Sequence, residues 1–216
     1  MKIVSIGEVV IDFYKYQALN YVGGIGLNFA VHSKRSSAGK VSIVSCVGDG
    51  RMGSWALETL SNEKIDISQV SIRRGKTAKC VVEVMENADR FFPSGGYEAN
   101  VLGQLDITNP IKNFISMHDT IFTHYDGTYK NSMLSKITNL RSDYNKFVVD
   151  FGDYSDKMIL NIPPKIFNRI DLAFFSGNKD TIELMVSIAK KNNLLIVVTM
   201  GSDGSYAITK SKLYFQ

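Results

Sequence analysis

The sequence predicts an α/β fold in which a mostly parallel sheet is covered by helices. Short apolar runs rich in Val, Ile and Phe alternate with helix-length amphipathic segments, and most of these runs are bounded by Gly or Asp. This alternation is typical of parallel strands joined by crossover helices. With 216 residues, 44% of them hydrophobic, the chain is long enough to bury the core of one domain.

The expected elements follow one another along the chain in β–α order. Buried strands are predicted at 3–6, 41–47, 120–123, 147–151, 172–175 and 194–199. Helices are predicted near 26–37, 51–62, 106–116, 130–140 and 179–192. In the last helix Ile182, Met185, Val186 and Ala189 form one apolar stripe at helical spacing.

Two regions, 12–22 and 77–92, indicate β structure without a following helix. In the second, Cys80, Val82 and Val84 alternate with the residues between them, and the segment 87–89 (Asn-Ala-Asp) suits a turn. These regions are expected to form a small antiparallel sheet standing off the main one. The alternative is a pair of edge hairpins of the main sheet.

The composition argues against several classes of protein. The net charge is +4 without a long Lys or Arg run, so nucleic-acid binding is not expected. Cys46 and Cys80 lie in apolar stretches, and the three histidines form no metal-ligand pattern, so neither a disulfide nor a zinc site is expected. No signal-peptide core and no apolar run of about 20 residues occurs. We therefore expect a soluble, cytoplasmic protein with no membrane partner.

The glycine-rich segment 23–30 (GGIGLNFA) is the most informative part of the sequence. Glycines allow a backbone to approach a ligand closely, and a helix that begins there directs N–H groups outward. Asn28 offers both a donor and an acceptor to a sugar hydroxyl. The segment does not end in Lys-Ser/Thr as a P-loop does.

Several short motifs occur in a characteristic order, and together they are more specific than any one of them. The order is 3–8 (IVSIGE), Asp12, 23–28 (GGIGLN), 47–49 (VGD) with Gly53, 77–78 (TA) and 199–204 (TMGSDG). This order resembles the PfkB or ribokinase-like carbohydrate kinases over nearly the whole chain. Within that family the sequence looks most like fructoselysine 6-kinase-like members, also called fructosamine kinases. The features are the short segment before Gly23, 87–90 (NADR) after Thr77, 150–151 (DF) and 174–176 (FFS).

The resemblance implies a doubly wound ribokinase-like sheet with a small β lid formed by about 12–22 and 77–92. It also implies an ATP-dependent kinase that uses Mg²⁺ and transfers the γ-phosphate to a hydroxyl of fructoselysine or a related fructosamine. A homodimer through the lid is a further candidate: the aromatic residues of the lid would either form its contact or cover the sugar.

Site residues carry over from the resemblance one by one. Asp12, Gly24 and Asn28 match sugar-binding positions. Thr199, Gly201 and Gly204 match the turn that approaches ATP, and Ser176 falls near the nucleotide phosphates. Arg90, His124 and Asp126 are further candidates for the sugar pocket from their positions. The alternatives are a turn or cap residue for Asp12, a surface ion pair for Arg90, and an ordinary hairpin loop for 199–204.

The sequence also departs from the family pattern. It contains no DTxGAGD string, so no catalytic residue is assigned and the general base is expected beyond Gln216. The NxxE pattern that helps to place magnesium is absent, and Asn178 or Asp180 is a candidate substitute.

We therefore expect one ribokinase-like domain over 1–216 that lacks the family's C-terminal part and turns over slowly by itself, because losing a general base costs a factor of about 10²–10⁴. A non-catalytic sugar-binding remnant is the alternative. A dinucleotide-binding domain, with Asp49 as its acidic residue, is a weaker third hypothesis.

Overall fold

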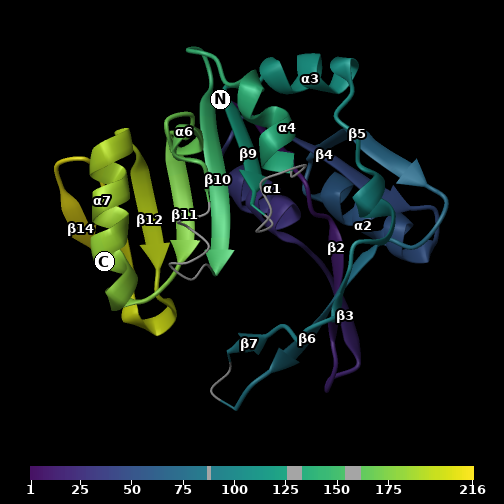
Figure 1. Ribbon diagram of the computed structural model, residues 1–216. Helices are drawn as coiled ribbons and strands as arrows, with labels where there is room; N and C mark the ends of the chain where they lie inside the picture. Colours follow the sequence, from purple (N-terminus) through teal and green to yellow (C-terminus); the bar gives the residue numbers. More distant parts are fainter. Residues whose placement is uncertain (87–88, 126–132, 154–161) are drawn as a thin grey trace. The chain divides into compact units, whose positions relative to one another are not determined.

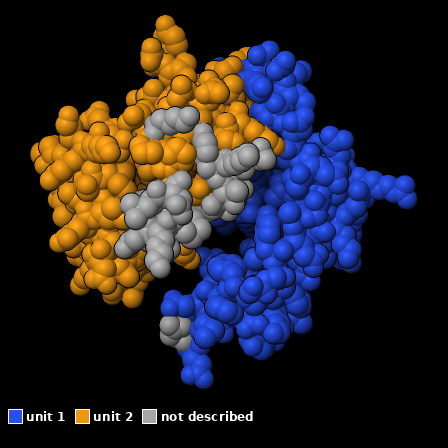
Figure 2. Space-filling model, viewed as in Figure 1, with its two compact units in different colours: residues 1–114 blue, residues 115–216 orange. Residues whose placement is uncertain are grey.

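The computed structural model describes residues 1–86, 89–125, 133–153 and 162–216. The chain divides into two compact units, Met1–Phe114 and Ile115–Gln216, which are coloured separately in Figure 2. Each unit contains mostly parallel strands flanked by helices, and the first unit carries a second, small mixed sheet. The predicted α/β class is therefore confirmed. No helix in the described ranges is long and apolar enough to cross a membrane.

The main strands of the first unit are parallel and have the order β1-β4-β5. Their bounds are Lys2–Ile6 (β1), Lys40–Gly48 (β4) and Asp66–Arg73 (β5). The helices are α1 (Ile25–Arg35), α2 (Arg51–Asn62) and the 3-10 helix η1 (Asn100–Gln104), followed by α3 (Asn109–Ser116). The sequence did not predict β5, because its alternation of polar and apolar residues over DISQVSIR is weak.

The small sheet consists of five short strands with the order β3-β2-β6-β7, and β8 pairs with β6 (Figure 1). Their bounds are Val10–Tyr14 (β2), Leu19–Gly23 (β3), Ala78–Val84 (β6), Arg90–Phe91 (β7) and Tyr97–Glu98 (β8). A separate sheet is thus confirmed, and the alternative of two edge hairpins is wrong. The expectation of a wholly antiparallel sheet is also wrong, because β2 and β6 pair in parallel. The predicted turn at Asn87 and Ala88 lies outside the described residues.

The strand registers give the small sheet two chemically different faces. Asp12 is paired with Tyr21 on one side and with Cys80 on the other, and these side chains share a face. Ile11 and Lys79 form a pair on the opposite face. The contacts agree with this division, since the Tyr14 and Tyr21 rings meet edge to face at 5.2 Å.

The second unit continues the same architecture with four parallel strands and an antiparallel hairpin. The strands are β9 (Thr120–His124), β10 (Lys146–Asp153), β11 (Leu172–Ser176), β12 (Leu195–Thr199), β13 (Ser205–Ile208) and β14 (Leu213–Phe215). The helices are α4 (Met133–Ile137), η2 (Thr138–Leu140), α6 (Pro164–Phe167), η3 (Lys179–Thr181), α7 (Ile182–Asn192) and η4 (Gly201–Asp203). Residues 130–132 of the predicted fourth helix lie outside the described residues.

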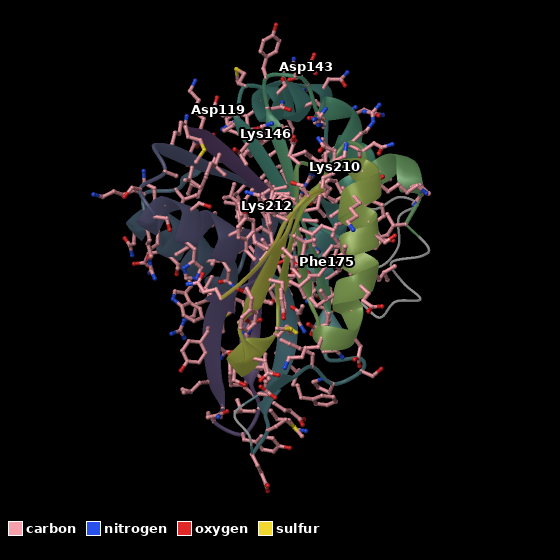
Figure 3. The ribbon with its side chains drawn as sticks, turned by 90° about the vertical axis from the view of Figure 1, so that its left-hand side faces the viewer. Asp119, Asp143, Lys146, Phe175, Lys210 and Lys212 are labelled. Carbon is pink, nitrogen blue, oxygen red and sulfur yellow. The ribbon has the colours of Figure 1, made fainter. Side chains whose placement is uncertain are left out.

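Each unit has its own apolar core beside its sheet. In the first unit, Ile43 of β4 packs with Leu27 of α1 and Leu60 of α2 in one buried cluster. In the second unit, Phe175, labelled in Figure 3, stacks on Phe151 with ring centroids 4.7 Å apart and planes 5° apart. The carboxyl ends of the parallel strands in the second unit carry three of the predicted site residues, His124, Ser176 and Thr199.

Candidate sugar and nucleotide sites

The first candidate site begins at the turn between β3 and α1. Gly24 is the residue that caps α1 and has a φ of 101°, a conformation that side-chain-bearing residues rarely adopt. An added Cβ there would lie 2.9 Å from the Glu8 carbonyl oxygen. The same carbonyl accepts a hydrogen bond from the Leu27 N–H at 3.0 Å, so the chain after β1 is held against the start of α1. A larger residue at position 24 would separate these two segments.

Asp12 lies directly against this glycine turn. A Cβ added to Gly23 would fall 2.2 Å from Asp12 Oδ2, so the carboxylate occupies the space that a side chain at position 23 would need. Asn28 lies one helical turn beyond Gly24 and its N–H donates to the Gly24 carbonyl at 2.9 Å. Its side chain is exposed. The structure therefore places Asp12, Gly24 and Asn28 around one turn, and their role in sugar binding stays a prediction.

Besides burial, one carboxylate (Glu8) and one guanidinium (Arg90) affect the pKa of Asp12. Burial raises the pKa of Asp12 to about 6, while Arg90 lowers this pKa and Glu8 raises it. Burial also raises the pKa of the Cys80 thiol to about 11, with further contributions from Asp12 and Glu8. We call Glu8, Asp12, Cys80 and Arg90 the Asp12 cluster. With both carboxylates ionised it carries one net negative charge.

Sequence reasoning named Asp12 and Arg90 but missed Glu8 and Cys80 as members of this cluster. Glu8 was noted only as part of the motif around Gly7, and nothing in the sequence indicated that its charge raises the pKa of Asp12. Cys80 required the parallel pairing of β2 with β6, which places it opposite Asp12. Chemically, the cluster offers carboxylate acceptors to hydroxyl groups and a counter-charge to a cation.

The predicted nucleotide residues also come together, in the second unit. Ser176 and Thr199 are paired at the carboxyl ends of β11 and β12. The Gly177 N–H donates to the Thr199 carbonyl at 2.9 Å. In open α/β sheets ligands gather at the carboxyl ends of parallel strands, so this placement suits a ligand site.

The turn after Thr199 depends on two glycines in left-handed conformations. Gly201 has a φ of 59° and an added Cβ would meet nothing within 4 Å, so the space beside it is open. Gly204 has a φ of 90°, and a Cβ there would lie 2.3 Å from the Gln216 carbonyl oxygen. The turn is a 3-10 helix followed by β13, and the Met200 N–H donates to the Gly204 carbonyl at 2.9 Å. This geometry exposes the backbone at Gly201 to an approaching ligand.

The two candidates for placing a metal, Asn178 and Asp180, are joined by a local hydrogen bond. The Asn178 side chain accepts a hydrogen bond from the Asp180 N–H at 3.0 Å and so caps η3. Across the described ranges, no group of three or more His, Cys, Asp or Glu side chains is arranged to hold a metal. Mg²⁺ that arrives with a nucleotide keeps most of its bonds to phosphate and water, so it needs few protein ligands.

His124 lies at the end of β9, where its partner in register is Asp150 of β10. Burial raises the pKa of Asp150, while the Gly152 N–H, which donates to its carboxylate at 2.8 Å, and His124 lower it. Asp150 was noted in the sequence only as a strand end. Asp126 lies outside the described residues. The role of His124 in a sugar pocket stays a prediction.

Comparisons with known proteins give one family match and several similar proteins. The family described as pfkB family carbohydrate kinase matches residues 1–215. The fructosamine kinase FrlD of Bacillus subtilis (strain 168) is 25% identical over 100% of this chain and 75% of its own length. The fructoselysine 6-kinase of Escherichia coli (strain K12) is also 25% identical, over 95% of this chain and 76% of its own length.

A solved structure shows the same fold. The fructokinase of Vibrio cholerae O395, in a fructose-, ADP- and calcium-bound form, matches 99% of this chain and 75% of its own with a TM-score of 0.71 and 18% identity. The fold is therefore ribokinase-like, and the dinucleotide-binding hypothesis is not supported. Since the family match covers nearly every residue, the chain belongs to the pfkB family of carbohydrate kinases.

Proposed function

We propose that this chain binds a fructosamine such as fructoselysine at the Asp12 cluster and ATP at the glycine turn after β12, for transfer of the γ-phosphate to a sugar hydroxyl. The observation that carries the proposal is the placement of the Asp12 carboxylate against Gly23, beside Gly24 and Asn28. A partly buried carboxylate can accept hydrogen bonds from sugar hydroxyls, and the exposed Asn28 amide offers both a donor and an acceptor.

The residues of this chain would act mainly by positioning. Phosphoryl transfer requires a hydroxyl to be held in line with the γ-phosphate, and there is little covalent chemistry for the protein to perform. Asp12 would orient two adjacent hydroxyls of the sugar. The open backbone at Gly201 would admit the nucleotide, consistent with ADP in the Vibrio cholerae fructokinase structure. ATP bound with Mg²⁺ would supply the phosphoryl group.

The charge of the Asp12 cluster supports a cationic sugar. Glu8 and Asp12 together outweigh Arg90 by one negative charge. A fructosamine carries a protonated secondary amine at neutral pH, whereas fructose is neutral. A protonated amine would therefore interact favourably with the excess negative charge of the cluster. The names of the two curated relatives point to the same substrate class.

Calorimetric titration of the chain with fructoselysine and with fructose tests this proposal. We choose binding rather than turnover as the measurement, because the residues proposed to bind the sugar all lie in this chain. We expect fructoselysine to bind at least tenfold more tightly than fructose at pH 7.5. A Glu8→Gln variant keeps the backbone carbonyl that contacts Leu27 and should reduce the preference. If neither sugar binds while ATP does, the sugar-site assignment is wrong.

Sugar binding should also depend on pH through Asp12. The ionised carboxylate accepts hydrogen bonds from hydroxyls, and its pKa in the free protein is about 6. Affinity should therefore be highest above pH 7 and should fall about tenfold for each pH unit below 6. Calorimetric titrations between pH 5 and 8 measure this. A flat profile in the unmodified chain would show that Asp12 does not contact the sugar.

A further inference from the structure

A cavity of about 460 Å³ lies in the first unit, on the face of the small sheet opposite the Asp12 cluster. Its walls are the first turn of α2, the segment Gly75–Thr77, and the side chains of Ile11 and Phe13 on β2 and Lys79 on β6. Ile11 and Phe13 flank Asp12 in sequence, so their side chains point to the other side of the strand. This cavity is therefore distinct from the proposed sugar site. We propose that it binds a small phosphorylated metabolite.

Among the charged side chains that line the cavity, cations outnumber carboxylates. Arg51, Lys76 and Lys79 come from three different elements, and Glu98 carries the only carboxylate among the lining residues, all of which are described. Glu98 is already engaged, because its Oε2 accepts a hydrogen bond from Asn100 Nδ2 at 3.4 Å. The lining residues therefore carry two net positive charges, or one when the neighbouring Asp49 carboxylate, which accepts the Gly75 N–H at 3.0 Å, is counted. This surplus of positive charge favours an anion such as a phosphate monoester.

Residues from the start of a helix also line the cavity. The cavity is lined by Gly50–Gly53, which contain the first turn of the 12-residue helix α2. The first hydrogen bond of the helix runs from the Ser54 N–H to the Gly50 carbonyl at 3.1 Å. The N–H groups before Ser54 therefore have no acceptor within the helix. A Cβ added to Gly50 would meet nothing within 4 Å, so the approach to these groups is open. Together with three cations, they form a donor set suited to phosphate.

The size and the walls of the cavity suit an organic phosphate better than inorganic phosphate. Ligand pockets for small organic molecules have volumes of about 300–1,000 Å³, and this cavity falls within that range. Ile11, Phe13 and Met52 supply apolar surface, and Asn20 supplies an amide. The Lys79 ammonium lies 4.5 Å from the Phe13 ring centroid, which holds that cation at the cavity wall. A phosphate attached to a polar organic group fits this combination.

An occupant would touch the strands that carry the Asp12 cluster. Lys79 and Cys80 are adjacent on β6, and Phe13 follows Asp12 on β2. A ligand bridging α2 to these strands would fix the small sheet and so change sugar affinity, and by linkage the sugar would change affinity for the ligand by the same factor. This coupling depends on the proposed sugar site, whereas binding to the cavity does not.

The test uses the 216-residue chain labelled with ¹⁵N, titrated with inorganic phosphate, with glucose 6-phosphate and with glucose. We expect saturable shifts of the Gly50, Gly53 and Gly75 amide signals with both phosphates, at least tenfold tighter binding of glucose 6-phosphate, and no shift with glucose. Asp12→Asn should leave this binding unchanged, which separates the cavity from the sugar site.

A double variant, Arg51→Gln with Lys76→Gln, should weaken glucose 6-phosphate binding at least tenfold. Both side chains are exposed, so the fold should persist, and the same spectra verify it. Arg74→Gln is the matched control, because Arg74 is an exposed cation two residues from Lys76 and outside the cavity lining. Phosphate that leaves the three glycine signals unmoved would overturn the site. Equal affinity for the two phosphates would overturn the metabolite assignment.

Discussion

Replacing Asp12 with Asn should weaken sugar binding about 100-fold while making the ligand-free chain more stable at pH 7. A carboxylate that accepts hydrogen bonds from two hydroxyls contributes on the order of 1.5–3 kcal/mol for each bond. The amide of Asn retains one acceptor oxygen, loses the charge and presents a donor where an acceptor is needed. Binding therefore falls by the equivalent of about 2–3 kcal/mol.

The gain in stability follows from the sign of the pKa shift. The pKa of Asp12 is about 6 in the folded chain and 3.8 in the absence of burial, so the folded state holds the proton more strongly than the unfolded state. Ionised Asp12 therefore opposes folding above pH 6, and this penalty disappears as the pH falls toward 4. Because the carboxylate is partly solvated, we expect the penalty to be only about 1 kcal/mol.

Urea unfolding at pH 7 and calorimetric sugar titration measure the two effects on the same samples. Glu83→Gln is the matched control, because Glu83 lies on the same sheet and pairs with Lys15 at 2.6 Å. It should leave sugar affinity unchanged and should not stabilise the chain. An Asp12→Asn variant that binds sugar normally would show that this carboxylate has no part in recognition.

Replacing Gly53 with Ala should destabilise the first unit by about 3 kcal/mol. A Cβ at position 53 would lie 1.8 Å from the Gly48 carbonyl oxygen and 3.2 Å from Thr77 Oγ1. Thr77 Oγ1 also accepts the Gly48 N–H at 3.0 Å, so the end of β4 has little freedom to move. Overpacking a rigid site typically costs 1–3 kcal/mol, and a clash with backbone falls at the upper end of that range.

Gly50→Ala provides the control for this effect. Gly50 has extended backbone and open space where its Cβ would lie, so the substitution should cost only about 1 kcal/mol, because Ala is a poorer N-cap residue than Gly. Urea denaturation followed by tryptophan fluorescence suits the comparison, because Trp55 lies on α2. If the two variants have the same midpoint, then α2 does not pack against β4 as described.

Much of the fold was predictable because buried parallel strands have a strong local signal. The strands at 3–6, 41–47, 120–123, 147–151, 172–175 and 194–199 were all confirmed within a few residues. Asp66–Arg73 was missed because an edge strand with one polar face resembles a loop in sequence. The parallel pairing of β2 with β6 was also missed, because it joins segments far apart in the chain and depends on no local motif.

Part of each site was predictable because glycines in a motif often mark positions with a positive φ or a close backbone neighbour. Gly24 and Gly204 have positive φ and close backbone neighbours, and both were named from the motif. The electrostatic partners of Asp12 were not all named, because Glu8 and Cys80 gain their role from tertiary packing. The charge and burial of a site depend on the fold. Residue types and their spacing in the sequence predict them only in part.

The most direct measurement is a crystal structure of the chain bound to fructoselysine. We expect sugar hydroxyls within hydrogen-bond distance of the Asp12 carboxylate and the Asn28 amide, with the sugar ring against Gly24. Density for the sugar at another place, with Asp12 solvated and Asn28 without contact to the ligand, would show that the Asp12 cluster is not the sugar site.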